Sequence, residues 1–170
     1  AIAANPKGRY YVHCYLGKDR VNVVKRLVSQ TAKTDESEPT ESRSLDEISS
    51  FERGPVVELS EGVYLTPFPT DEEYMGYVIA AGVKQVVSLM DTTDTEARER
   101  VLTERRLLGT YRIPLREFPV LEATSEAHLG LLFRELTTMP RPVLIHRFFS
   151  DHDVERRFID AYRKSIQPPA

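Results

Sequence analysis

From residue 55 onward, short segments with strand character alternate with longer segments of helical periodicity. The strand-type segments are brief and apolar, and they cover 56–59, 63–65, 85–89, 110–115 and 142–146. Parallel strands need a crossover of about a dozen residues between them, and that crossover is usually a helix. The sequence therefore predicts an α/β fold in which a largely parallel sheet is flanked by helices on both faces.

Polar residues and glycines mark where the helices of this region begin and end. Glycines 82 and 109 are predicted to end the first two helices, since glycine favours the left-handed position after a helix. A last helix is predicted over 154–166. The residues predicted to cap the N-termini are Thr70 in a capping box with Glu73, then Thr93 or Asp94, and then Ser125.

Composition excludes several classes of protein. The chain has 170 residues and a net charge of −3. It therefore lacks the excess of basic residues that would indicate nucleic-acid binding. No apolar run approaches the ~20 residues of a membrane span. The single cysteine excludes an internal disulfide and favours a reducing, cytoplasmic location. The four histidines and this cysteine lack paired metal-ligand spacing, so neither a metal nor another cofactor is expected.

Changes in character along the chain predict three parts. Residues 1–30 read as strand, loop and helix, 31–54 as an acidic linker with at most one helical turn, and 55–170 as a domain. The chain starts without methionine and enters a strand almost at once. We therefore expect a fragment or a processed chain, able to pack with an upstream domain that is absent here.

The single cysteine lies in a loop suited to binding an anion. An apolar strand over 8–13 leads to Cys14, and a helical pattern over 20–30 follows Arg20. Loop amides and the start of a helix attract an anion, and the arginine fork can grip two phosphate oxygens. A cysteine in such a field loses its proton easily and becomes a nucleophile. The alternative is a buried structural cysteine at the end of a strand.

This loop resembles the phosphate-binding loop of the cysteine-dependent protein tyrosine and dual-specificity phosphatases, whose pattern is His-Cys, five residues, Arg. The resemblance implies that Cys14 attacks phosphorus and forms a phosphocysteine, while His13 orients the loop and tunes the thiol. Arg20 and the amides between it and the cysteine hold the phosphoryl oxygens. Those amides belong to Tyr15, Leu16, Gly17, Lys18 and Asp19.

Two further details of the loop bear on substrate and rate. The run 17–20 resembles a variant found in relatives that act on phosphoinositides as well as phosphoproteins. A phosphorylated protein or a phosphoinositide is therefore the expected substrate. The family usually has Ser or Thr after the arginine, where its hydroxyl helps the thiolate leave, but this chain has Val21. Breakdown of the phosphoenzyme is therefore expected to be slow.

A second strand–loop–helix near the C-terminus matches the first in layout but not in chemistry. His146 aligns with His13, whereas Arg147 and Asp153 replace the nucleophile and the phosphate-binding arginine. Residues 55–166 also resemble a whole dual-specificity-type domain, which implies a tandem arrangement with a degenerate loop. Arg147 stays protonated and Asp153 would repel phosphate, so this copy is predicted to be inactive.

Several roles in the second copy stay open. Arg147 and Asp153 could pair across the loop, or His146 and His152 could simply be polar loop residues. The resemblance implies an acidic general acid after the 110–115 strand, where Glu117 or Glu122 could act.

Two classes of function remain. One is a phosphatase acting through Cys14; the other is a non-catalytic pseudophosphatase module for interaction or regulation. Three arrangements would reconcile the two loops: the tail of an active domain followed by an inactive one, a permuted single domain with a composite site, or association of two chains.

Overall fold

The computed structural model of this protein describes residues 44–147 and 152–167. Every prediction on residues 1–43 lies outside this part of the chain. No helix within it combines the length and apolar character needed to cross a membrane. In chain order its elements are η1 (Leu45–Glu47), β1 (Ser50–Phe51), β2 (Gly54–Pro55), β3 (Val57–Ser60), β4 (Val63–Pro67), α2 (Asp71–Glu73), η2 (Tyr74–Val78), β5 (Gln85–Ser88), α3 (Thr95–Thr110), β6 (Leu115–Glu117), α4 (Glu126–Thr138), β7 (Val143–Arg147) and α5 (His152–Ile166).

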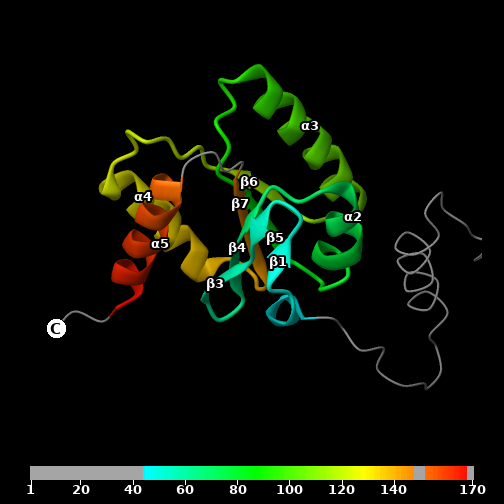
Figure 1. Ribbon diagram of the computed structural model, residues 1–170, viewed down its shortest axis with the longest axis horizontal. Coiled ribbons are helices and arrows are strands. Elements are labelled where there is room, and N and C mark those ends of the chain that lie inside the picture. The colour runs from blue at the N-terminus through cyan, green and yellow to red at the C-terminus, as the bar shows by residue number, and fades with distance from the viewer. Residues whose placement is uncertain (1–43, 148–151, 168–170) are drawn as a thin grey trace, which may run out of the picture.

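The main sheet has five strands in the order β3-β4-β7-β5-β6. β3 pairs antiparallel with β4, and the remaining pairs are all parallel. α4 and α5 lie on one side of this sheet, whereas α2 and α3 lie on the other (Figure 1). The predicted fold class, a largely parallel sheet with helices on both faces, is confirmed.

Alternation along β7 decides which side chains face which helices. Successive side chains of a strand point to opposite faces. Val143 and Ile145 belong to the apolar cluster formed with α4 and α5. Leu144 belongs to the cluster on the α3 face, and His146, two positions on, contacts α3 as well. The next residue, Arg147, therefore faces the α4 and α5 side of the sheet.

Residues 44–54 fold onto the domain, although 31–54 was predicted to be a linker. Leu45 and Phe51 are 2% and 5% exposed, within the apolar cluster on the α3 face. The Phe51 ring stacks on Tyr77 with centroids 5.9 Å apart, and the Tyr64 hydroxyl donates to Asp46. The acidic composition of these eleven positions favoured a linker, but a few apolar side chains bury the segment against the domain.

The helix starts agree closely with the capping pattern. Thr70 and Glu73 form the predicted capping box. Asp94, rather than Thr93, caps α3, and its carboxylate accepts a backbone N–H bond of 2.8 Å from the third residue on. Ser125 caps α4 in the same way. These caps satisfy N–H groups that have no partner within the helix.

Three predicted boundaries were wrong or incomplete. The helix predicted after Thr70 is one α-helical turn followed by the π-helix η2. As predicted, this segment ends before Gly82, whose φ is +69°. α3 does not stop at Gly109 but runs to Thr110, and Arg112 takes the left-handed conformation at φ 56°. The predicted strand over 110–115 therefore starts only at 115, where β6 pairs with β5.

Candidate functional site

A pocket of about 340 Å³ lies at the carboxyl ends of the parallel strands. Leu89 and Met90 follow β5, Val120 follows β6, and Arg147 ends β7. Open parallel sheets bind ligands at this edge, because loops diverge there and helices begin there. The pocket therefore occupies the position at which a doubly wound domain normally carries its site.

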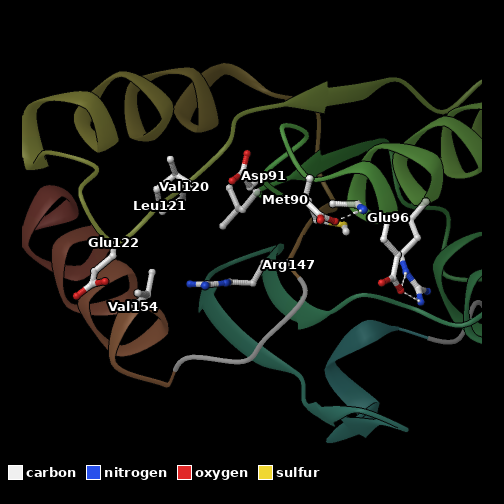
Figure 2. A pocket seen from close by; sticks show the side chains of 12 residues that line it. Met90, Asp91, Glu96, Val120, Leu121, Glu122, Arg147 and Val154 are labelled. Carbon is white, nitrogen blue, oxygen red and sulfur yellow. Dashed lines mark hydrogen bonds and ion pairs between the residues drawn. The ribbon is translucent and has the colours of Figure 1, made fainter.

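Arg147 is the side chain that β7 delivers to this pocket. Figure 2 shows it extending toward the wall formed by Val154 and Glu122. A guanidinium stays protonated at any physiological pH, so it cannot attack an electrophile or take a proton. The strand end that precedes the loop therefore carries no nucleophile in this domain.

Carboxylates outnumber cations around this pocket. Arg100 joins Arg147 in the lining, against four acidic side chains. Glu96 is paired with Arg100 at 2.7 Å, which leaves the other acids to oppose an incoming dianion. A phosphate group is therefore poorly matched to this lining. The acids are Asp91, Asp94, Glu96 and Glu122.

Two of those acids are already used to start α3. Asp94 is its N-cap, and Asp91 accepts hydrogen bonds of 2.9 and 2.6 Å from the backbone and hydroxyl of Thr93. These bonds lower the pKa of the Asp91 carboxyl from its usual value. Both carboxylates therefore shape the turn before the helix, and neither is placed like a paired general acid and base.

His146, just before Arg147, belongs to a buried polar network. Its side chain is fully buried, and its Nε2 lies 2.6 Å from Oε1 of Glu104 on α3. The Tyr74 hydroxyl donates to the same oxygen, and Phe68 packs edge-on against the imidazole at 5.1 Å. The network ties the end of β7 to α3 and η2, and it excludes the alternative of a simple polar loop residue.

Burial sets the electrostatics of this network. It raises the pKa of the Tyr74 hydroxyl well above its usual value, and the charge and hydrogen bond of Glu104 raise it further. Tyr74 therefore stays neutral and serves as a donor. Glu104 Oε2 and His146 Nδ1 are buried, and neither has a hydrogen-bond partner among the described residues.

The other residues predicted for the second copy, Asp153 and the candidate acids Glu117 and Glu122, have different partners and surroundings. The Asp153 side chain is 85% exposed at the start of α5 and pairs with Arg156 at 3.1 Å. Its predicted pairing with Arg147 stays a prediction. Of the two candidate acids, Glu117 pairs with Arg105, whereas Glu122 lines the pocket.

Sequence reasoning missed three residues that position this region. Arg157 of α5 donates to the backbone carbonyl of Glu122 at 2.6 Å, and so holds the loop that borders the pocket. The hydroxyl of Tyr74 on η2 donates to Glu104. Glu104 lies between Val101 and Leu108 on the buried face of α3, and a carboxylate at that helical spacing was a readable signal.

The predicted catalytic and phosphate-binding residues lie outside the described residues. These are His13, Cys14, Tyr15, Leu16, Gly17, Lys18, Asp19 and Arg20. Among the described residues, no group of three or more His, Cys, Asp or Glu side chains is placed to hold a metal ion.

No family model and no curated protein sequence matches this chain. Solved structures resemble it. A proposed phosphatase (DUF442) from Shewanella putrefaciens CN-32 has a TM-score of 0.56 at 15% identity, over 74% of this chain and 81% of that one. The core catalytic domain of the PP-IP phosphatase Siw14 from S. cerevisiae has a TM-score of 0.49 at 15% identity, over 72% and 81%. A kinase associated phosphatase with serine in place of its catalytic cysteine has a TM-score of 0.43 at 16% identity, over 66% and 75%. The first of these likenesses shows that the described residues have a phosphatase-like α/β fold.

Proposed function

We propose that this chain is a cysteine-dependent phosphatase in which Cys14 carries the chemistry and the described domain is catalytically silent. The observation that carries the proposal is Arg147 at the end of β7, the strand end that leads into the loop. The fold is phosphatase-like, yet its own loop begins with a cation rather than a thiol. Under this proposal the nucleophile comes from elsewhere in the chain, and Cys14 is the single cysteine.

In the proposed reaction, the Cys14 thiolate attacks phosphorus while the bond to the ester oxygen breaks. The alcohol leaves after receiving a proton, and water then releases phosphate and regenerates the thiolate. Arg20 and the amides of residues 15–19 hold the phosphoryl oxygens throughout. The proposed substrates are phosphomonoesters of the phosphotyrosine, phosphoserine, phosphothreonine or phosphoinositide class.

For the described domain by itself, a pseudophosphatase role as an interaction or regulatory module is the second candidate. The acidic lining of the strand-end pocket favours it, because that lining opposes a phosphate dianion. On this view the domain contributes binding rather than catalysis, whichever of the three arrangements joins it to the first loop.

Single-turnover release from an aryl phosphate by the full chain tests the proposal. Cys14→Ser should lower the rate by about a thousandfold or more, since it removes a covalent nucleophile. Arg147→Ala is the matched variant in the second loop, and it should leave the rate within about twofold. Equal rates for Cys14→Ser and the original chain would refute catalysis by the thiol. No turnover by the original chain, with Cys14 labelling like an ordinary thiol, would favour the binding module.

A further inference from the structure

A groove of about 600 Å³ lies between η2 and α3, on the other side of the sheet from α4 and α5. This volume is within the range of small-molecule sites. Glu96 and Arg100, near the start of α3, line both this groove and the strand-end pocket. The groove is lined by Phe68, Asp71, Tyr74, Met75, Glu96, Glu99, Arg100, Thr103, Glu104, Leu107 and Tyr111.

The groove combines aromatic walls with an excess of negative charge. Three of its lining side chains are aromatic, and four are carboxylates against one guanidinium. That guanidinium, of Arg100, is paired with Glu96. No hydrogen bond or ion pair within the described part of the chain engages the side chains of Asp71 and Glu99. Their charges are therefore available at the rim of the groove.

Glu104 provides an independent observation that points to a hydrogen-bond donor in this groove. Its side chain is fully buried where it lines the groove, and its Oε1 already accepts from the Tyr74 hydroxyl and lies 2.6 Å from Nε2 of His146. Within the part of the chain that the structure describes, Oε2 has no hydrogen-bond partner. A buried carboxylate oxygen without a donor is costly, and such atoms call for an explanation in a native structure. A donor entering from the groove would supply one.

We propose that this groove binds an organic cation, a guanidinium or ammonium group carried on an apolar stem. The charged end directs N–H donors toward Glu104, and the carboxylates of Asp71 and Glu99 add attraction at the rim. The stem lies against the aromatic walls, which also favour cations through their ring faces. Burial raises the pKa of the Tyr74 hydroxyl most, and the charges of Glu104 and Asp71 raise it further.

The lining argues against two other kinds of ligand. An anion would meet carboxylates on most sides of the groove. A divalent metal needs several closely placed oxygen ligands, and within the described ranges no three acidic or histidine side chains are grouped in that way. An organic cation needs only spaced carboxylates and an apolar wall, and the groove provides both.

The test uses the full-length chain and two probes of nearly equal shape. Butylguanidinium carries the charge, and butylurea is its neutral counterpart. In ligand-observed NMR titrations, butylguanidinium should bind about tenfold or more tightly, because it forms charge-assisted hydrogen bonds. Glu99→Gln and Asp71→Asn should each weaken it about two- to threefold, and the double variant further. Glu126→Gln, an exposed acid on α4 outside the groove, should not change it.

Three results would overturn the proposal: equal binding of the two probes, equal loss in Glu126→Gln and Glu99→Gln, or no loss in the rim variants. The rim variants change exposed side chains, so they should fold normally. Acetyl-arginine methylamide then separates two sources of the cation. Tighter binding than butylguanidinium identifies a protein arginine, and weaker binding identifies a free small molecule. None of these measurements depends on Cys14, so they stand apart from the proposed phosphatase activity.

Discussion

Two stretches of this sequence, each predicted to form a strand, a loop and a helix, share a histidine and differ at both positions predicted to be reactive. The first has Cys14 and Arg20, whereas the second has Arg147 and Asp153. In the second segment, His146 is fully buried and bonded to Glu104, while Asp153 is largely exposed. In the second stretch, therefore, the histidine belongs to the packing of the sheet, whereas Arg147 lines a pocket and Asp153 faces solvent.

This contrast separates what the fold requires from what the reaction requires. Replacing a buried, hydrogen-bonded group leaves its partners unsatisfied, which is costly. Replacing a side chain at a pocket wall or an exposed helix start costs little stability. Substitutions at Arg147 and Asp153 should therefore cost much less stability than substitutions in the buried network of His146.

The largest expected effect concerns that network. Glu104→Ala removes the hydrogen-bond partner of both Tyr74 and His146, and we expect it to lower the free energy of unfolding by about 3–5 kcal/mol. Urea denaturation at pH 7 measures the change. Glu99→Ala, exposed on the same helix, is the matched control and should change stability by less than about 0.5 kcal/mol. Similar values for the two variants would mean that the network contributes little to holding β7.

The second effect concerns Val21 in the first segment. The family resemblance gives that position a hydroxyl that helps the thiolate leave, and loss of one such donor typically costs about a hundredfold in rate. We expect a product burst followed by a slow steady state. Val21→Thr should accelerate the steady state by up to about a hundredfold and leave the burst nearly unchanged. A linear time course that Val21→Thr does not alter would show that phosphoenzyme breakdown is not limiting.

A third experiment asks whether the second loop can be turned back into the first. In a Cys14→Ser background, the pair Arg147→Cys and Asp153→Arg should bind vanadate about tenfold more tightly than the unaltered loop, because it gains a charge-assisted contact and loses a repulsive charge. Arg147→Cys alone should show no gain, since Asp153 still opposes the anion. Isothermal titration measures both. Tight vanadate binding by the unaltered loop would contradict the idea of a relict site.

The sequence predicted the parts of this comparison that depend on local patterns. Apolar strand segments, caps at Thr70 and Ser125, and the layout of the second loop were all readable, because each depends on neighbouring residues. The His146–Glu104 bond was not, since it joins positions 42 residues apart and arises from how α3 packs on the sheet. The left-handed turn at Arg112 was missed because glycine is only the preferred residue for that conformation.

The smallest expected effect concerns an exposed ion pair, which serves as the reference for the buried pair of Glu104 and His146. Arg116 on β6 holds Glu135 on α4 through two bonds of 2.9 and 3.0 Å, and both side chains are more than 40% exposed. The hydrogen bond from Arg116 holds the pKa of the Glu135 carboxyl below its usual value. A lowered folded-state pKa stabilises the protein above the unfolded-state pKa, and that contribution is lost as pH falls through the folded value. Solvent screening limits it to about 0.5 kcal/mol.

Glu135→Gln should therefore cost about 0.5 kcal/mol at pH 7, and the difference from the original chain should shrink below about pH 4. Urea denaturation across this pH range, at low salt and at about 1 M NaCl, measures it. Salt should reduce the effect of Glu135→Gln, because exposed charges are screened, and should hardly change the effect of Glu104→Ala. If salt instead reduced the loss of stability equally in Glu135→Gln and Glu104→Ala, the Glu104–His146 pair would behave like a solvated pair. The contrast between a buried structural histidine and exposed reactive positions would then lose its physical basis.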